Sequence, residues 1–596
     1  MLNRKDSVYL LPYFSYTNRY HQLKNKMDRI TTSLIKELLE SQELTSKGES
    51  KDFEKLVNYT VISNEYNKTF DIETLTIGEG NDTGIDGLAI IVNGQLVESI
   101  DEVDGLIEKN NFLEVEFVFT QSKTSSTFSG ADINTFLFGV LDFFSTTPKL
   151  IRNQSIVKNI EISNHIYDNA SIFKKNPKIK LFYVTTGKWT DDQNLKGIIE
   201  NGIESLEDTN LFENVIFTPY GSRELSIAYR KTKESVSTSI NFNNRITMPE
   251  IKGISQAYIG LLPYSEFIKI VSDDEDKLLS VFEDNVRDFQ GTNNDVNGGI
   301  SSTLNNADSE IFSVLNNGVT IVASSISPTG NQFTITDYQI VNGCQTSNVL
   351  YNNRNIDNIE NISIPIKLIA TTDDEIKTRI TLATNNQTPI KKEQLASLTQ
   401  FQRSLEEYYN SYSGDAQLYY ERRSKQYNTD NNVLKSRIIT VPYQIKSFAG
   451  MFLDEPHNVT SYFGSIVRRL NEGKAQIFSK DHIYSPYYTS AFAYYKLETF
   501  FRKGSIDTSY RKVKFHLLML FRKLNQQDNL PPFNSKKMNA YCDKLLTILN
   551  DDTLAVKAFE KCVKIIDDSE FDKTDKQDVK LVSKTKILIE YANTEI

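Results

Sequence analysis

The alternation of apolar and polar positions is clearest in the segment FLEVEFVFTQSK, which runs from Phe112 to Lys123. A period of two predicts a β-strand whose successive side chains point to opposite faces. On one face, phenylalanines are followed by Gln121 and then by Lys123. The strand is therefore expected to end with an amide oxygen and an ammonium group side by side.

Two predicted elements precede this strand. Residues Lys51–Ile62 carry apolar side chains at helical spacing, with Glu54 in the first turn. The segment GNDTGIDGLAIIV then predicts a glycine-bracketed turn that leads into a short strand opening at Asp86. Asp86 and Gln121 can meet only if their strands pair antiparallel, because one residue begins its strand and the other ends its own. We therefore expect residues 95–110 to form an insertion or a peripheral strand.

A helix over 130–145 and a strand over 179–186 are predicted to follow. This order of elements resembles the restriction-endonuclease-like, or PD-(D/E)XK, nuclease core, in the variant with glutamine as the middle ligand. The resemblance implies that Asp86 and Gln121 hold Mg²⁺ or Mn²⁺, with Glu54 completing the shell. It also implies that Lys123 orients or deprotonates the attacking water. A hard cation with oxygen ligands polarises a phosphodiester and lowers the pKa of its water.

Each of these residues also has an ordinary structural interpretation. Asp86 could be a turn former, Lys123 a solvated strand end, and Glu54 an acid that suits a helix N-terminus. Glutamine supplies an oxygen but no charge, which weakens the case for a cation. An alternative hypothesis therefore stays open, in which the chain is a non-catalytic nucleic-acid-binding or nucleotide-binding regulatory protein with a degenerate nuclease fold.

Composition limits the class of protein. The 596 residues are 39% hydrophobic and 24% charged, values typical of a soluble globular protein with several domains. No apolar run approaches the roughly 20 residues that span a bilayer, and the start of the chain does not resemble a signal peptide. Three cysteines in so long a chain indicate a reducing compartment. We expect a cytoplasmic protein that does not bind a membrane.

The distribution of histidine and cysteine excludes several kinds of site. Five histidines and three cysteines are scattered through the sequence without metal-ligand spacing. The sequence therefore shows no residue pattern typical of a zinc site or of a Ser-His-Asp triad. This favours a carboxylate-and-lysine mechanism. The net charge of −10 is unusual for a general nucleic-acid binder, but a nuclease needs only a basic channel within an acidic whole.

A second informative region lies in the middle of the chain. Six segments there are, in order, LSVFEDNVRDFQG (279–291), VNGGISSTL (296–304), FSVLNNGVTIVA (312–323), YQIVNGCQTSNVLY (338–351), LATNNQTPI (382–390) and LYYERRSKQY (418–427). Together they resemble the AIPR family, named for abortive infection and phage resistance, over roughly residues 251–430. Members of that family often carry a nuclease-like segment at the N-terminus, and the resemblance implies a role in anti-phage defence.

The segment 338–351 predicts a strand, a glycine turn and a helix N-terminus, an arrangement whose free amides can bind a phosphate. The candidate nucleic-acid-binding or nucleotide-binding residues of this region are Arg287, Asn317, Asn342, Gly343, Gln345 and Thr346. The asparagine and glutamine side chains could equally form a buried amide network that fixes loop geometry. Arg287 could be an internal salt-bridge partner. Both interpretations stay open, as does a nucleotide that gates the protein.

The aromatic-rich segments 485–501 and 513–524 predict the core of a helix bundle, and residues 235–248 predict a further strand. The fold as a whole is predicted to be α/β (α+β), with five parts along the chain. These are a helical extension (1–50), a nuclease-like domain with a mixed sheet flanked by helices (51–190), a bridging region (191–250), an α/β AIPR-like domain (251–430) and a helical C-terminal region (431–596).

The leading functional hypothesis is a cytoplasmic, Mg²⁺-dependent endonuclease of anti-phage defence, with DNA favoured over RNA as substrate. The AIPR-like body would recognise the trigger, bind the nucleic acid or restrain the nuclease. A phage-derived trigger or partner protein is a further expected partner. We also expect a homodimer, because nucleases of this class often need two active sites to cut both strands.

Overall fold

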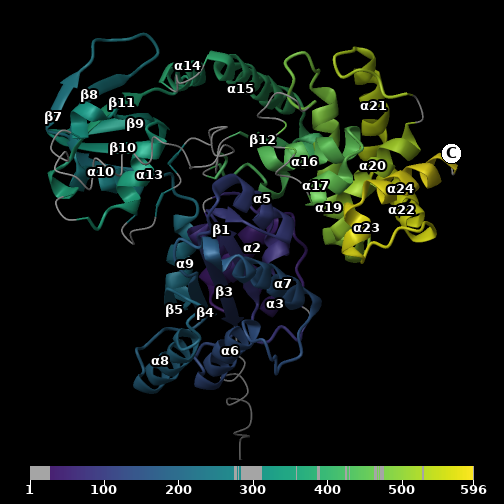
Figure 1. The fold of residues 1–596 in the computed structure, drawn as a ribbon, viewed down its shortest axis with the longest axis horizontal. Coiled ribbons are helices and arrows are strands. Elements are labelled where there is room, and N and C mark those ends of the chain that lie inside the picture. The colour runs from purple at the N-terminus through teal and green to yellow at the C-terminus, as the bar shows by residue number, and fades with distance from the viewer. Residues whose placement is uncertain are drawn as a thin grey trace, which may run out of the picture.

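The computed structural model describes residues 27–596, apart from 67, 79, 274–277, 280, 283–311, 357–358, 385–388, 423–425, 429, 462–465, 467–468, 470–475, 527–528 and 595–596. Two mixed sheets precede a helical C-terminal region, so the predicted α/β (α+β) class is confirmed (Figure 1). In the described part of the chain, no helix is both long and apolar enough to cross a membrane.

The first sheet has the strand order β2-β1-β3-β4-β5. Its strands are β1 (Gly87–Val92), β2 (Gln95–Leu96), β3 (Val115–Lys123), β4 (Lys178–Thr185) and β5 (Asn214–Tyr220). β1 pairs directly and antiparallel with β3, with Gly87 opposite Thr120. Residues 95–110 form the two-residue edge strand β2 and helix α5 (Ile100–Asn110). The predicted pairing, and the peripheral position of this segment, are confirmed.

Helices cover both faces of this sheet, in the way that the period of two in β3 requires. Phe117 and Phe119 belong to a core with α6 (Gly130–Phe143), α7 (Gln154–Asp168) and α8 (Gln193–Glu207). On the other face, Val118 belongs to a second core with α3 (Glu49–Glu65), α2 (Arg29–Ser41) and α9 (Ser222–Lys231). α8, β5 and α9 lie within the predicted bridging region, yet they continue this first unit, because β5 pairs parallel with β4.

The second sheet has the order β6-β10-β9-β11-β8-β7. Its strands are β6 (Ser237–Asn241), β7 (Asn244–Thr247), β8 (Gln256–Pro263), β9 (Val319–Thr329), β10 (Gln332–Asn342) and β11 (Ser363–Ala370). Helices α10 (Tyr264–Val271) and α13 (Cys344–Asn352) contribute to its core.

This second sheet is rolled up. β6 and β7 are its two edges, and three peptide steps from Asn241 to Asn244 can span only about 11 Å. A flat sheet of six strands would separate its edges by about 24 Å. The Arg245 side chain accordingly lies 4.6 Å from the centre of the Phe333 ring on β10. The prediction of one strand over 235–248 is therefore wrong: the segment forms two strands, β6 paired with β10 and β7 paired with β8, because the chain passes from one edge of the rolled sheet to the other.

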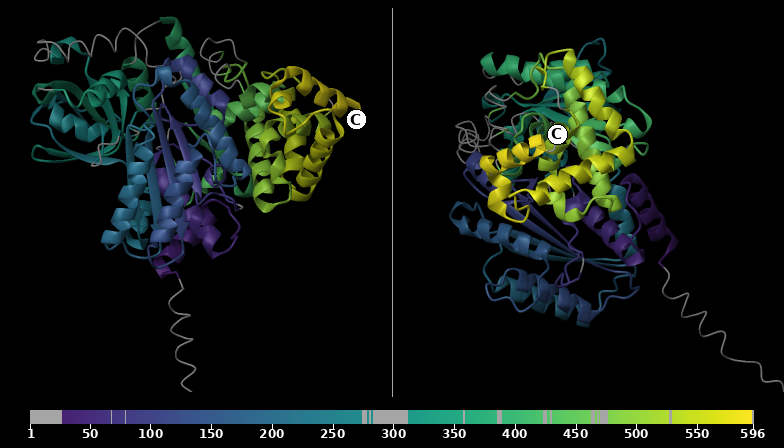
Figure 2. Two further views of the ribbon diagram at one scale, coloured as in Figure 1. Left: turned by 60° about the horizontal axis from the view of Figure 1, so that its bottom comes forward. Right: turned by 90° about the vertical axis from the view of Figure 1, so that its right-hand side faces the viewer.

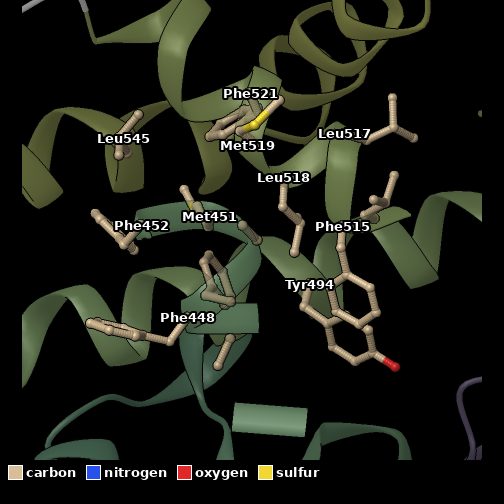
Figure 3. Packing of buried hydrophobic residues seen from close by; sticks show 14 of the residues in the cluster. Phe448, Met451, Phe452, Tyr494, Phe515, Leu517, Leu518, Met519, Phe521 and Leu545 are labelled. Carbon is tan, nitrogen blue, oxygen red and sulfur yellow. The ribbon is translucent and has the colours of Figure 1, made fainter. Parts of the chain in front are cut away.

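Helices α14 (Asp374–Thr384) and α15 (Pro389–Asn410) lead across to the helical region (Figure 1). That region contains the short parallel pair β12 (Tyr419–Glu421) and β13 (Ile438–Thr440), and the helices α16 (Val441–Phe452), α17 (Pro456–Ser461), α19 (Ser485–Lys503), α20 (Lys514–Asn525), α21 (Lys537–Leu549), α22 (Asp552–Asp568), α23 (Lys576–Lys580) and α24 (Val582–Thr594). Residues 485–501 of α19 are all buried, and its rings pack with those of α16 and α20 (Figure 3). The prediction that these aromatic residues form a core is confirmed.

The helical region lies beside the first unit (Figure 2) and is joined to it by several ion pairs. In four of them the acidic group belongs to the first unit and the basic group to the helical region. The pairs are Glu43–Arg437 (3.0 Å), Asp71–Arg511 (3.6 Å), Asp101–Lys580 (2.9 Å) and Glu102–Lys446 (3.1 Å). Complementary charges therefore contribute to the contact between these two parts of the chain.

Candidate functional site

Asp86 lies immediately before β1, at the end of the sheet where β3 finishes. Its backbone N–H donates to the Thr120 carbonyl at 2.9 Å, so the antiparallel register carries Asp86 alongside the last residues of β3. Its Oδ2 atom accepts three hydrogen bonds: from Gln121 Nε2 (3.1 Å), from the backbone N–H of Ser122 (2.7 Å) and from Ser122 Oγ (2.9 Å). The structure therefore brings Asp86 and Gln121 into direct contact.

Glu54 reaches the same place from α3. Its side chain is only 4% exposed, and its Oε2 accepts a hydrogen bond from Lys51 Nζ at 2.6 Å. Burial raises the pKa of Glu54 to about 7; the negative charge of Asp86 adds to this effect, and Lys51 opposes it. Burial also raises the pKa of Asp86, against the hydrogen bonds from Ser122 and the positive charge of Lys123. Each of these two buried acids thus has too little positive charge nearby to keep its pKa at the ordinary value.

Lys123 is the last residue of β3 and is half-buried. Its charge acts on Asp86 in the direction that favours the carboxylate. It shares a strand face with Gln121, as the period of two requires. All four predicted residues of the nuclease-like site therefore come from elements that converge on Asp86.

Helix α3 is fixed to the strands by Asn58, one turn beyond Glu54. Asn58 Nδ2 donates to the Asp86 carbonyl at 3.2 Å, and Asn58 Oδ1 accepts from Thr120 Oγ1 at 2.5 Å. A side chain at Gly87 would collide with both Asn58 and Thr120, so the close approach of the helix requires glycine there. This bracing fixes helix α3, which carries Glu54, against the strand ends at Asp86 and Thr120.

Sequence reasoning missed three contributors to this site: Lys51, Asn58 and Ser122. Lys51 and Asn58 flank Glu54 at spacings of three and four, so all three lie on one face of the helix. That spacing was an available signal. Ser122 carried no comparable signal in the sequence, because alternation assigns its side chain to the strand face opposite Gln121. It reaches Asp86 because Asp86 lies just before the paired part of β1.

Two oxygen atoms of the site are buried without a hydrogen-bond donor among the residues that the structure describes. They are Oε1 of Glu54 and Oε1 of Gln121. A buried acceptor without a partner costs about 1–3 kcal/mol, so each of these two oxygens needs an explanation. A divalent cation supplies one, because hard cations take carboxylate and amide oxygens as ligands. These residues therefore fit such a cation.

The ligand set would be sparse in acids. Within the described residues, no group of three or more histidine, cysteine, aspartate or glutamate side chains is placed to hold a metal ion. A cation here would rest on two carboxylates, Glu54 and Asp86, and on the neutral amide of Gln121. Mg²⁺ is compatible with this, because it commonly keeps several waters and takes only one or two protein carboxylates.

The candidates of the middle region have structural contacts. Asn342 Nδ2 donates to the Thr384 carbonyl at 2.6 Å, which ties the end of β10 to the end of α14. Gly343 has a φ of 89°, a conformation that favours glycine, and α13 begins immediately after it, as predicted. Thr346 is buried and Gln345 half-buried in the first turn of α13, whereas Asn317 is exposed before β9. Arg287 lies outside the described residues.

Comparison with known proteins gives one match. No curated protein and no solved structure matches the chain. The family model described as AIPR protein matches residues 282–576. The match begins later than the predicted 251 and continues past 430 through most of the helical region, and it leaves the site at Glu54, Asp86 and Gln121 outside. Over residues 282–576, therefore, the chain is similar to the AIPR protein family.

Proposed function

We propose that this protein is a metal-dependent nuclease of anti-phage defence, which hydrolyses phosphodiester bonds at the Glu54–Asp86–Gln121–Lys123 site. One observation carries the proposal. Gln121 contacts Asp86, Glu54 and Lys123 both interact with Asp86 by charge, and Glu54 and Gln121 each keep one buried oxygen without a donor among the described residues. The similarity to the AIPR family supports the role in abortive infection.

The roles of the residues follow from their positions. Asp86, Gln121 and Glu54 would hold Mg²⁺ through their oxygens. When bound, the cation polarises the phosphodiester and makes a bound water more acidic. Ser122 donates twice to Oδ2 of Asp86 and so fixes the direction of that carboxylate. Lys123 lies close enough to act on Asp86 by charge and would hold the attacking water or a phosphate oxygen.

The layered first unit supports the same proposal. A mixed sheet with β1 and β3 antiparallel and helices on both faces is consistent with the restriction-endonuclease-like core. The site lies in this unit, whereas the AIPR-like region lies in the second half of the chain. We infer that the AIPR-like region senses the trigger, binds the nucleic acid or restrains cleavage, and that Mg²⁺, or Mn²⁺ in its place, is the cofactor.

Cleavage assays test the proposal. Purified protein would be incubated with plasmid DNA and with RNA, with Mg²⁺ or with chelator, alongside the Lys123→Ala variant. We expect metal-dependent cutting, reduced in the variant by about 100-fold or more, because a positioned proton-transfer group contributes on that scale. Lys36→Ala is the matched control, since Lys36 is 77% exposed on α2. Parental cutting by Lys123→Ala, with an unchanged melting temperature, would contradict the assignment.

A second function stays in view because Gln121 brings no charge to the ligand set. In this second function, the first unit is a degenerate nuclease fold that binds nucleic acid or a nucleotide without cutting it. The hypothesis predicts no cleavage by the parent protein under any metal condition, together with nucleic-acid binding that survives chelator. Cutting that depends on Lys123 would exclude it.

A further inference from the structure

Lys51 stands apart from the other lysines that pair with acids in the first unit. Its ammonium group donates to Oε2 of Glu54 at 2.6 Å, while the other carboxylate oxygen of Glu54 is buried without a donor. Lys51 itself is 43% exposed, and its partner is 4% exposed. The pair therefore occupies one oxygen and leaves the other directed into the protein.

The next lysine on the same helix shows the ordinary arrangement. Lys55 lies one turn further on and pairs with Glu73 of α4 (Ile72–Leu75) at 2.5 Å, with both side chains largely buried. That pair joins two helices, and holding these helices together is a sufficient explanation for it. The Lys51–Glu54 pair joins no second element, because both residues belong to α3. Its hydrogen bond therefore bears on Glu54 alone, although the charge of Lys51 also reaches Asp82 and Asp86.

We propose that Lys51 is a positioning residue of the cation site. The inference rests on the proposed function. Holding Oε2 of Glu54 fixes the plane of the carboxylate, because one oxygen is tied and the remaining rotation is limited by burial. The free Oε1 is then presented on the side of the carboxylate away from Lys51. Lys51 thus acts through Glu54, as outer-shell partners of metal ligands commonly do.

Simple electrostatics makes the opposite prediction. Lys51 carries a positive charge near a place where a cation would bind, and its charge is felt by Asp82 and Asp86 as well as by Glu54. If it merely neutralised the acids of the cation-free protein, removing it would favour metal binding. The two views therefore differ in the sign of one measurable change.

The test is Mn²⁺ affinity, measured by calorimetric titration of the full chain and of three variants. Loss of an outer-shell partner commonly costs 10–100-fold in metal affinity, so Lys51→Met should bind Mn²⁺ about 10-fold more weakly. Lys51→Arg should come within a few-fold of the parent, because a guanidinium can also donate to Oε2. Lys36→Met is the control, because the Lys36–Glu40 pair also lies within one helix but is exposed at both ends.

Equal or tighter binding by Lys51→Met would overturn the inference and leave the cation site standing. Equal loss in Lys51→Met and Lys51→Arg would also overturn it, because the hydrogen bond would then not be the cause. Absence of Mn²⁺ binding by the parent would overturn the cation site and this inference together. Thermal unfolding of each variant separates these results from a loss of folding.

Discussion

Two glutamates, each with a side chain only 4% exposed, meet opposite electrostatic surroundings in this molecule. Glu498, on α19 of the helical region, accepts from both Arg511 and Lys514 at 2.7 Å. Burial alone would raise its pKa, yet these two cations hold the pKa of Glu498 at about 2. Burial raises the pKa of Glu54 to about 7, because it has one lysine and faces Asp86.

The difference separates a buried acid whose charge is compensated by cations from one whose charge is not. Glu498 is paired with two cations, and one of them, Arg511, also pairs with Asp71 of the first unit. Such a network fixes the packing of two parts of the chain. Around Glu54 the positive charge is too small for the acids present, and a buried oxygen is left free. Under the proposed function, a cation from solution would supply the missing positive charge.

Removing the acid from the structural network should have the largest effect on stability. Glu498→Ala leaves Arg511 and Lys514 buried without their main counter-charge. Breaking a buried pair in this way costs about 3–5 kcal/mol of unfolding free energy. Urea denaturation of the variant measures it, with Glu560→Ala, an exposed acid of α22, as the control. A loss below about 1 kcal/mol would show that the network does not hold this region together.

The pH dependence of stability should have opposite signs at the two glutamates. The pKa of Glu498 is lowered, so its contribution is present above pH 4.5 and is lost as pH falls toward 2. The pKa of Glu54 is raised from 4.5 to about 7, so the folded state holds its proton more tightly than the unfolded state. In chelator, stability should therefore fall as pH rises from 4.5 to 7, by up to about 1.4 kcal/mol per pH unit.

Glu54→Gln isolates this contribution. The variant cannot ionise at that position, so its unfolding free energy in chelator should change less than that of the parent between pH 5 and pH 7. Denaturation midpoints at the two pH values provide the measurement. Identical pH dependence in the parent and in Glu54→Gln would mean that Glu54 is not the strained acid described above.

Most elements of the first unit could be predicted from the sequence, because their patterns are local. The helix at Glu54 and the strands at Asp86 and Gln121 each have a clear hydrophobic period. The requirement that the side chains of Asp86 and Gln121 meet then predicted that their strands pair antiparallel. Pairing between distant strands has no such local pattern. The addition of β5 to the first sheet, and the change of partner between β6 and β7, depend on contacts made far along the chain.

In the candidate site, too, local patterns could be predicted from the sequence and contacts between distant segments could not. Periodicity placed the four residues on their helix and strands, and the resemblance to the nuclease core singled them out as a set. The bracing by Asn58 and the double donation from Ser122 depend on the distance between a helix and two strand ends, which no period gives. The free oxygens of Glu54 and Gln121 are likewise a property of packing, since a residue type says nothing of which neighbours reach it.

Metal titration tests the central claim most directly. Mg²⁺ and Mn²⁺ would be titrated by calorimetry into the parent protein, into Asp86→Ala and into the exposed-acid control Glu560→Ala. If the acids at the end of β3 await a cation, the parent and Glu560→Ala bind one ion per chain at the site, and Asp86→Ala loses it while keeping its melting temperature. Absence of binding by the parent, or unchanged binding by Asp86→Ala, would contradict the account.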